Sequence, residues 1–435
     1  MNNIILLNLP IKKQFEKYIQ EEAEYNPSLG LLAISSFLKM HGYNVIIKDF
    51  NYEMYSIDIV MNTIEEIDPL LVGITAFTEN VYEVINISKQ IKKLRDDIKI
   101  IVGGPHATLR PEDLIKSNYI DYVSMKEGES TFIELLEYLI SDGKSISLDM
   151  IDGLIYKKDN IPVKNRHRGH IGDLNLIPVI NRSIIGIEKY KGTVNVSTSR
   201  GCPANCIYCA ATVLSGACYR TRDVGGVFLE MLLLKYQLGI RLETIYFVDD
   251  TFTADIERVM QFLAYMKKSK VGIKWACESR VDVMTTELID KMVEYGCNSI
   301  QFGVESGNQE VLDKLHKNID LKHTKNIVAY ASKYEVEICL SFMFGHYCDT
   351  TETMDETLHF IEDLVIANVN VTIGVGYNTP FPGTWQFTHA ERIGLCILTN
   401  DYSKYDLITP IIETENFNAN DLVEVYNKAQ KYCKI

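Results

Sequence analysis

Long apolar runs are missing from this sequence of 435 residues. No stretch approaches the roughly 20 consecutive apolar residues that a membrane-spanning helix needs. The opening segment Met1–Pro10 (MNNIILLNLP) also lacks the positively charged start and the cleavage site of a signal peptide. We therefore interpret this segment as a first buried strand, and we expect a cytoplasmic protein without a membrane span.

Positive charge is also scarce. The chain has 44 Lys and Arg against 58 Asp and Glu, which gives a formal net charge of -14 at pH 7. Nucleic acid phosphates and anionic membranes need clustered Lys and Arg, so we expect no nucleic acid partner, although a local basic pocket stays open. Hydrophobic residues make up 46% and charged residues 23%, the balance of an ordinary globular protein with two or three domains.

Without a secretion signal, the ten cysteines are not expected to form a disulfide framework, because the cytosol keeps thiols reduced. Metal ligation is the better explanation for any that cluster. Three of them, Cys202, Cys206 and Cys209, lie within eight positions. The other seven are scattered: Cys218, Cys277, Cys297, Cys339, Cys348, Cys396 and Cys433.

Apolar runs rich in Ile and Val alternate with helical patterns over residues 1–140. Strands are predicted at NIILLNL, YNVIIKDF, LLVGITAF, IKIIVGG and YIDYVSM, and amphipathic helices at Leu31–Met40 and Val81–Arg95. Continuous apolar strands separated by helices indicate a parallel sheet buried on both faces. We expect an α/β fold that begins with a doubly wound Rossmann- or flavodoxin-like domain.

The rest of the chain divides into three parts. Residues 141–190 contain turn-forming residues and a small hairpin at DGLIYKKDNIPVKN, so we interpret them as a linker. Six further strands separated by helices, TVNVST, ETIYFVDD, IKWACESR, SIQFGVES, EICLSFMFG and NVTIGVGY, predict a partial (β/α)6 TIM-like barrel over residues 191–393. Residues 394–435 form a short helical segment with a terminal helix at Asp421–Lys434.

The cysteine triplet lies in STSRGCPANCIYC, directly after a predicted strand. Thiolates are the usual ligands of a 4Fe-4S cluster, and three from one loop leave one iron open to a small molecule with an amine and a carboxylate. Buried cysteines without a ligand, or a zinc site completed by a distant His or Cys, are the alternatives.

The CxxxCxxC spacing, with the aromatic Tyr208 before the last cysteine, resembles the signature of radical S-adenosylmethionine (radical SAM) enzymes. The resemblance implies a 4Fe-4S cluster on Cys202, Cys206 and Cys209 that cleaves S-adenosylmethionine reductively to a 5′-deoxyadenosyl radical. It also implies an external one-electron reductant of the flavodoxin or ferredoxin type. The protein itself then has to hold the cofactor and the substrate in the correct relative position.

In this resemblance, later strand ends supply cofactor contacts. Asp249 and Asp250 of FVDDTF stand where the family places polar groups near the methionine ammonium. A helix N-cap by Asp250 or Thr251 is the alternative. WACESR offers Glu278 and Arg280.

An arginine such as Arg280 can grip the methionine carboxylate with two parallel bonds, and a structural salt bridge is the alternative. The strand end FGVESG offers Glu305 and Ser306, which resemble the family's ribose-hydroxyl contacts, with Gly303 and Gly307 allowing close approach.

The front domain resembles the cobalamin-binding domain that precedes the radical domain in a large subgroup of this family. The resemblance rests on NPSLGLLAISSFLKMHGYNV, GITAFT, GGPHAT and DYVSMKEGESTF. It implies a cobalamin pocket formed by Thr75, Thr78, Gly103, Gly104, Pro105, His106 and Glu127. A turn capped by Thr108 is the alternative for GGPHAT, and a helix cap or a catalytic pair is the alternative for Glu127 and Glu129.

The DxHxxG sequence that supplies a histidine ligand to cobalt in other cobalamin proteins is missing, because Asp49 is followed by FNYEM. Bound cobalamin should therefore lack a histidine ligand from that motif. We expect His106 to be a pocket residue rather than a cobalt ligand.

The leading hypothesis is a cobalamin-dependent radical methyltransferase in which one S-adenosylmethionine methylates cobalt and another yields the radical that activates the substrate. A radical cyclase, rearrangement or epimerisation enzyme is the second hypothesis, and a non-catalytic cobalamin or redox sensor is the third. No second cysteine group follows the barrel, so a small-molecule or lipid-like natural product is the expected substrate. Tyr347, Tyr377 and Trp385 are candidates for its pocket.

Overall fold

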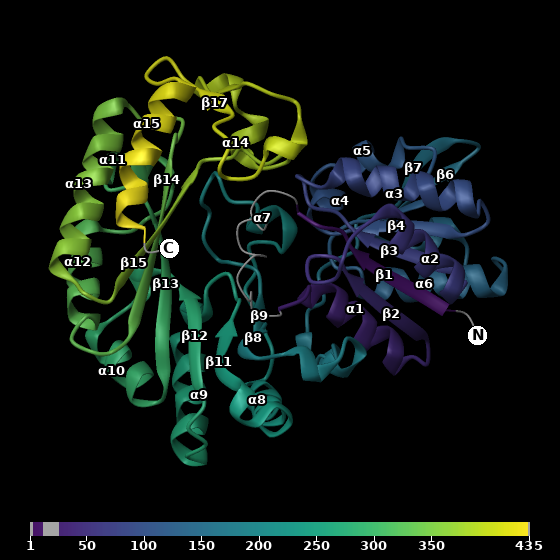
Figure 1. Cartoon of the computed structure of the whole chain (residues 1–435), viewed down its shortest axis with the longest axis horizontal. Coiled ribbons are helices and arrows are strands. Elements are labelled where there is room, and N and C mark those ends of the chain that lie inside the picture. The colour runs from purple at the N-terminus through teal and green to yellow at the C-terminus, as the bar shows by residue number, and fades with distance from the viewer. Residues whose placement is uncertain (1–2, 12–25, 434–435) are drawn as a thin grey trace. The chain divides into compact units, whose positions relative to one another are not determined.

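The computed structural model describes residues 3–11 and 26–433. Met1 and Lys434, the outer ends of the predicted first strand and terminal helix, lie outside the described residues. The chain divides into two compact units, residues 1–191 with 213–215 and residues 192–212 with 216–435 (Figure 1). The expected domain boundaries at residues 140, 190 and 393 stay predictions.

The front unit contains a seven-stranded sheet in the order β2-β1-β3-β4-β5-β6-β7. The first five strands pair in parallel, and their order 2-1-3-4-5 is that of flavodoxin-like folds. The strands are β1 Asn3–Asn8, β2 Asn44–Asp49, β3 Leu71–Thr75, β4 Lys99–Gly103, β5 Tyr122–Ser124, β6 Leu154–Lys158 and β7 Ile161–Lys164. The predicted doubly wound fold is confirmed.

Helices lie on both faces of this sheet (Figure 1). Helix α1 packs with α6, and α2 packs with α3. The central strand β3 is buried along its whole length, which explains its unbroken apolar sequence LVGIT. The helices are α1 Leu29–Met40, α2 Ile57–Ile67, α3 Val81–Leu94, α4 Pro105–Leu109, α5 Pro111–Ile115 and α6 Glu129–Ser141.

The hairpin predicted at DGLIYKKDNIPVKN is present as β6 and β7. It does not stand apart from the front sheet, because β6 pairs antiparallel with β5 and so extends the sheet. In the part of the chain that the structure describes, no helix combines the length and the apolar character that crossing a bilayer requires.

The second unit contains six parallel strands in the order β15-β14-β13-β12-β11-β8, so strands that are adjacent in this sheet also follow one another along the chain. This is a curled, open half-barrel, and it confirms the predicted partial (β/α)6 barrel. The strands are β8 Gly192–Val196, β11 Leu242–Phe247, β12 Lys274–Ser279, β13 Cys297–Glu305, β14 Glu337–Phe344 and β15 Val371–Tyr377.

Helices cover the outer face of the half-barrel (Figure 1). Side chains on that face are fully buried and apolar, and the stacked rings of Phe247 and Phe252, 4.8 Å apart, pack with Phe262 and Trp275. The helices are α8 Val224–Leu238, α9 Ile256–Ser269, α10 Thr286–Glu294, α11 Gln309–Lys314, α12 Leu321–Ala331 and α13 Thr351–Ala367.

The last segment is less purely helical than expected. A short antiparallel pair, β16 Cys396–Ile397 and β17 Ile412–Glu413, precedes helix α15 Ala419–Ala429. Helix α15 packs on α13 and β15. The remaining short elements are β9 Ser199–Arg200, α7 Ala211–Leu214, β10 Arg220–Thr221 and α14 Trp385–Thr388.

Candidate active site

The cysteine loop follows β8 and is fixed by backbone hydrogen bonds on both sides. The N–H of Ile207 donates to the carbonyl oxygen of Leu315 at 3.2 Å, and the N–H of Gln386 donates to the carbonyl oxygen of Ile207 at 3.1 Å. Gly201 has a φ of +89°, and a Cβ there would lie 2.3 Å from the carbonyl oxygen of Cys218. Only glycine fits this turn into the loop.

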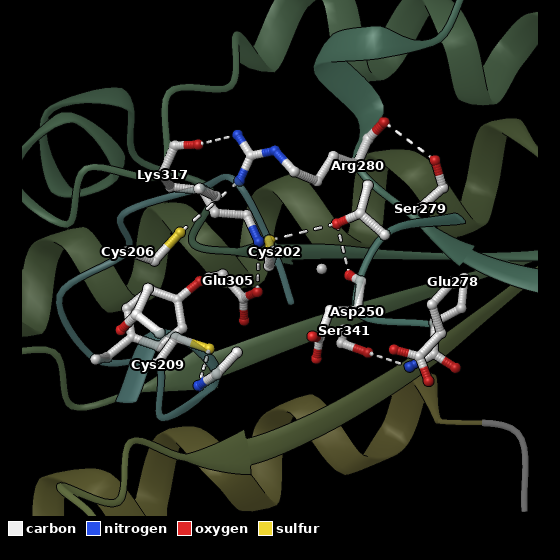
Figure 2. Close-up of a pocket in the computed structure, with 17 residues that line it drawn as sticks. Cys202, Cys206, Cys209, Asp250, Glu278, Ser279, Arg280, Glu305, Lys317 and Ser341 are labelled. Atoms are coloured by element: carbon white, nitrogen blue, oxygen red, sulfur yellow. Dashed lines mark hydrogen bonds and ion pairs between the residues drawn. The ribbon is translucent and has the colours of Figure 1, made fainter. Parts of the chain in front are cut away.

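All three cysteines of the loop line one pocket of about 270 Å³ at the carboxyl edge of the half-barrel (Figure 2). The Cys202 Sγ lies 3.5 Å from the Thr251 Oγ1, and the Cys206 Sγ lies 3.8 Å from the Arg280 Nη1. Burial raises the pKa of Cys209 to about 11. Bound iron would reverse this shift, because a metal ion stabilises the thiolate that ligates it.

The geometry of the triplet differs from that of a zinc site. Within residues 3–11 and 26–433, no three His, Cys, Asp or Glu side chains lie close enough together to share one metal ion. A zinc ion draws its ligands to a single point, whereas each thiolate of a 4Fe-4S cube binds a different iron. Three cysteines around one pocket therefore fit a cluster better than a single ion.

Arg280 lies beside the cysteines at the end of β12. Its guanidinium pairs with Asp282 at 3.0 Å and also donates to the carbonyl oxygen of Lys317. The structural salt bridge that we considered for Arg280 is present, and the residue lines the pocket as well. The two readings are compatible, because the pairing fixes the guanidinium next to Cys206.

Glu305 lines the pocket from the end of β13, where it adopts a φ of +74°. Its carboxylate pairs with the Lys317 ammonium at 2.8 Å, and the two side chains are only 10% and 8% exposed. The pairing between β13 and β14 shifts register between Gly303 and Glu305, which marks a bulge. A bulge turns the strand end and thereby redirects Glu305.

Two of the expected cofactor contacts point away from the pocket. Asp249 is buried and accepts hydrogen bonds from the N–H groups of Thr198 at 2.6 Å and Ser199 at 3.0 Å. Ser306 is buried against Thr357 of α13, and a Cβ on Gly307 would lie 2.7 Å from the Cα of the same residue. Both residues therefore fasten loops or helices rather than lining the cavity.

Several of the alternatives from sequence are wrong. Neither Asp250 nor Thr251 caps a helix through its side chain, since the short turn that follows has no such bond. Helix α6 begins after Gly128, with Glu129 in its first turn, and the Glu127 carboxylate accepts a hydrogen bond from the N–H of Ile171. Helix α4 likewise follows Gly104 without a side-chain cap.

The expected set at this pocket is otherwise brought together. Tyr208, Asp250, Glu278 and Arg280 line it with the cysteines and Glu305. The aromatic candidates do not, since Tyr347, Tyr377 and Trp385 are not among its lining residues.

Six further polar residues line the pocket but are not among the site residues predicted from the sequence: Thr212, Thr251, Ser279, Gln301, Lys317 and Ser341. The alternation of side chains along a strand could have indicated two of them, Gln301 and Ser341. Successive side chains of a strand point to opposite faces, so Gln301 shares a face with Gly303, two positions along, and Ser341 lies opposite Gly303 in the next strand. Counting in steps of two from Tyr246 of β11 likewise leads to Asp250 and not to Asp249.

In the front unit, the segments GITAFT and GGPHAT meet at the carboxyl edge of the sheet. Thr75 is paired with Gly103, and the N–H of His106 donates to the carbonyl oxygen of Ala76 at 2.9 Å. Gly104 has a φ of +94°, and a Cβ there would lie 2.6 Å from the Thr75 Oγ1. The chain therefore presents backbone rather than side chains at this edge, which suits a large flat cofactor.

His106 is fully buried beneath this edge, with its Nδ1 3.3 Å from the Thr78 Oγ1 and its Nε2 3.7 Å from an Asp113 carboxylate oxygen. Both ring nitrogens of His106 therefore face protein side chains. Pro105 and Glu127 are half-buried, and the Glu127 carboxylate accepts a hydrogen bond from the N–H of Ile171 at 2.6 Å.

Asp49, where a DxHxxG motif would begin, has a structural role. Its buried carboxylate accepts hydrogen bonds from the N–H of Ser28 at 3.1 Å and from the side-chain amide of Asn8 at 3.0 Å. The carboxylate thereby joins β1, β2 and the start of α1.

Family models match both units. Residues 18–136 match the B12 binding domain, and residues 196–361 match the radical SAM superfamily. An uncharacterised methyltransferase of Pyrococcus horikoshii is 31% identical over 410 residues, which cover 93% of this chain and 86% of that protein. An anaerobic magnesium-protoporphyrin IX monomethyl ester cyclase of Rubrivivax gelatinosus is 25% identical over 411 residues, which cover 92% and 72%.

Among solved structures, the radical S-adenosylmethionine methyltransferase TsrM of Kitasatospora setae, with cobalamin and a 4Fe-4S cluster bound, superposes with a TM-score of 0.76. The match covers 92% of this chain and 78% of that one at 18% identity. This likeness concerns the fold, because the sequences have diverged far.

Proposed function

The chain belongs to the radical SAM superfamily and carries a B12-binding domain ahead of its radical SAM domain, and we propose that it is a cobalamin-dependent methyltransferase that acts on a small molecule. The observation that carries the proposal is the single pocket in which three cysteines of one loop face charged side chains from the ends of three strands. When bound, the cluster supplies the electron that cleaves S-adenosylmethionine, and cobalamin carries the methyl group.

Cys202, Cys206 and Cys209 are assigned as the cluster ligands in this proposal. The fixed loop presents all three to one cavity, and Arg280 brings positive charge next to Cys206. That charge stabilises a thiolate and an anionic cluster. An external flavodoxin or ferredoxin is the proposed electron donor.

The charged residues of the pocket suit the groups of S-adenosylmethionine. Arg280 is held in place by Asp282, so its guanidinium is preorganised to bind a carboxylate. Asp250 offers a carboxylate to the ammonium group, and Glu305 offers one to the ribose hydroxyls while Lys317 fixes its position. Each of these residues binds or orients the cofactor.

The carboxyl edge of the front sheet is the proposed cobalamin site. Gly103, Gly104 and Pro105 leave backbone open there, Thr75 pairs with Gly103 from the neighbouring strand, and Thr78 in the loop after that strand contacts His106. His106 is buried, so this chain provides no imidazole to cobalt from that segment. We propose that His106 stabilises the backbone of this edge.

Anaerobic reconstitution tests the proposal. The protein is loaded with iron, sulfide and hydroxocobalamin, and bound iron, the cobalamin spectrum and 5′-deoxyadenosine are measured after reduction. S-adenosylmethionine with a labelled methyl group is then supplied with candidate substrates. We expect uptake of both cofactors and a product heavier by one methylene. A protein that takes up the cluster but no cobalamin would contradict methyl transfer.

A second function is favoured by the likeness to the Rubrivivax cyclase. A radical cyclase, rearrangement or epimerisation enzyme would form 5′-deoxyadenosine without adding a methyl group. Product mass separates the two functions, because only methyl transfer adds a methylene. A non-catalytic sensor would form no 5′-deoxyadenosine at all.

A further inference from the structure

Part of the inner face of the half-barrel is polar. In a closed TIM barrel the inward side chains are bulky and apolar, because they fill the interior as a packed core. Here the inward side chains of four neighbouring strands include Tyr246, Glu278, Gln301 and Ser341, which are all half-buried, next to Ala276, Cys339 and Met343. The last strand, β15, contributes Gly374, which leaves room beside them. Half-buried polar side chains in a cavity indicate a ligand that forms hydrogen bonds.

Of these residues, Glu278, Gln301 and Ser341 line the pocket, and Glu278 and Ser341 lie toward its end away from the cysteines (Figure 2). Glu278 belongs to β12, whereas Arg280 follows the last residue of this strand, so Glu278 lies deeper in the half-barrel. The cysteine end therefore carries the groups assigned to the cofactor. The Glu278 end is left for the substrate.

The hydrogen bonds at this end leave acceptors in excess. The Tyr246 hydroxyl lies 3.3 Å from the Glu278 Oε1 and 3.0 Å from the Gln301 Oε1. A phenol has one proton to donate, so it serves only one of the two oxygens at a time. The Gln301 amide donates to the Ser341 Oγ at 3.5 Å. A ligand with donors of its own would complete this set.

The charges of the pocket lead to the same class of ligand. Both cationic side chains are already paired, Arg280 with Asp282 and Lys317 with Glu305. Among the described residues, neither Asp250 nor Glu278 has a cationic partner. Asp250 lies at the cysteine end and is assigned to the ammonium of S-adenosylmethionine, and no cationic side chain of the described pocket residues pairs with the Glu278 carboxylate. Burial raises the pKa of Glu278, and a bound cation would lower it again.

We propose that the substrate is a small polar molecule with a basic nitrogen, which binds the Glu278 carboxylate beside Gln301, while the Tyr246 hydroxyl holds these two side chains in position. This inference rests on the proposed function, because it takes the pocket to be the place of methyl transfer. It narrows the substrate class and departs from our expectation of a lipid-like product, since a lipid would leave the polar inner face unsatisfied.

The test measures binding, so it does not depend on turnover. Three probes that differ in one group, phenethylamine, 2-phenylethanol and phenylacetate, are titrated into the reconstituted protein saturated with S-adenosylmethionine. Calorimetry gives the dissociation constants for the wild type and for Glu278→Gln. Glu337→Gln is the matched control, because Glu337 is exposed at the opposite end of β14.

We expect phenethylamine to bind about tenfold more tightly than the alcohol, and phenylacetate to bind most weakly. Glu278→Gln should remove the preference for the amine, whereas Glu337→Gln should keep it. Equal binding of the three probes, no binding of any, or an amine preference that survives in Glu278→Gln would overturn the inference. Failure of the methyl-transfer assay with intact amine binding would instead contradict the proposed function.

Discussion

The two parallel sheets of this protein are built from similar strands but treat their faces differently. The front sheet is covered by helices on both faces, and its central strand β3 is buried at every position. The half-barrel is covered on its outer face, while its inner face includes half-buried polar side chains such as Glu278, Gln301 and Ser341. A parallel sheet thus becomes a site by leaving one face without a helix, and its inward residues are then selected for chemistry rather than for packing.

The carboxyl edges of the two sheets differ in the same way. At the front edge the chain offers backbone, with His106 hidden beneath it. At the half-barrel edge it offers side chains, including thiols, carboxylates and a guanidinium. The front edge suits a large preformed cofactor that needs a surface, and the half-barrel edge suits reactants that must be bound by several side chains. Four experiments can break or sharpen this comparison.

The largest effect is expected for Cys206→Ala. The substitution removes one thiolate of the triplet, so cluster assembly and 5′-deoxyadenosine formation should be abolished, while the front unit stays folded and still takes up cobalamin. Bound iron, the visible spectrum and product formation are the measurements. Cys218→Ala, at an exposed cysteine outside the triplet, is the control. Retained cleavage activity in Cys206→Ala would contradict the ligand assignment.

Lys317→Met should destabilise the second unit by about 3 kcal/mol, because it leaves the buried Glu305 carboxylate without its partner. The double variant Glu305→Gln with Lys317→Met should recover part of that loss. Urea unfolding followed by circular dichroism measures both. Lys314→Met, which breaks an exposed pair on α11, should change little. A double variant no more stable than the single one would contradict the account.

Acid should weaken the front unit through His106. The unfolded chain protonates this residue near pH 6.5, whereas burial lowers its pKa to about 4 in the folded chain, against the opposing charges of Asp113 and Glu112 and together with Arg110. Between these values only the unfolded state binds the proton, so stability falls as the pH drops from 6.5 to 4, by about 3 kcal/mol at most.

Unfolding of His106→Gln across this pH range is the measurement. The variant should lose less stability than the wild type between pH 6.5 and 4. The exposed His41→Gln is the matched control. Parallel pH profiles for wild type and His106→Gln would show that the buried imidazole does not carry the effect.

The smallest effects separate the two sheets directly. Val72→Thr places a hydroxyl in β3, where the side chain is fully buried, and should cost about 1 to 2 kcal/mol. Ser341→Val makes the opposite exchange on the half-buried inner face of β14, and should change stability by less than about 0.5 kcal/mol. Equal losses in urea unfolding would mean that the two faces are packed alike.

The strands of both sheets and the cysteine loop could be predicted from the sequence, because apolar runs and close cysteine spacing are local signals. The division of labour between adjacent residues could not be read so directly. Asp249 and Asp250 are neighbours with the same side chain, yet one holds Thr198 and the other lines the pocket. They differ only in the direction of their side chains, because successive side chains of an extended chain point to opposite sides.

Lys317 shows a second limit. It lies in a turn after α11, and nothing in its neighbourhood marks it as functional. It reaches the pocket because the turn is folded back toward β13, where Lys317 meets Glu305. Such a partnership depends on contacts between segments that are apart in the chain. Periodicity and spacing carry no information about them.

The backbone bonds that join Ile207 to Leu315 and to Gln386 link protein groups only, so we expect them to hold this part of the cysteine loop in place without a metal. Small zinc domains behave differently, since their folding and metal binding are one event. If oxygen destroyed the cluster, the cysteine loop that binds it would therefore stay folded. The damaged enzyme could be recharged with iron and sulfide instead of being degraded and synthesised anew.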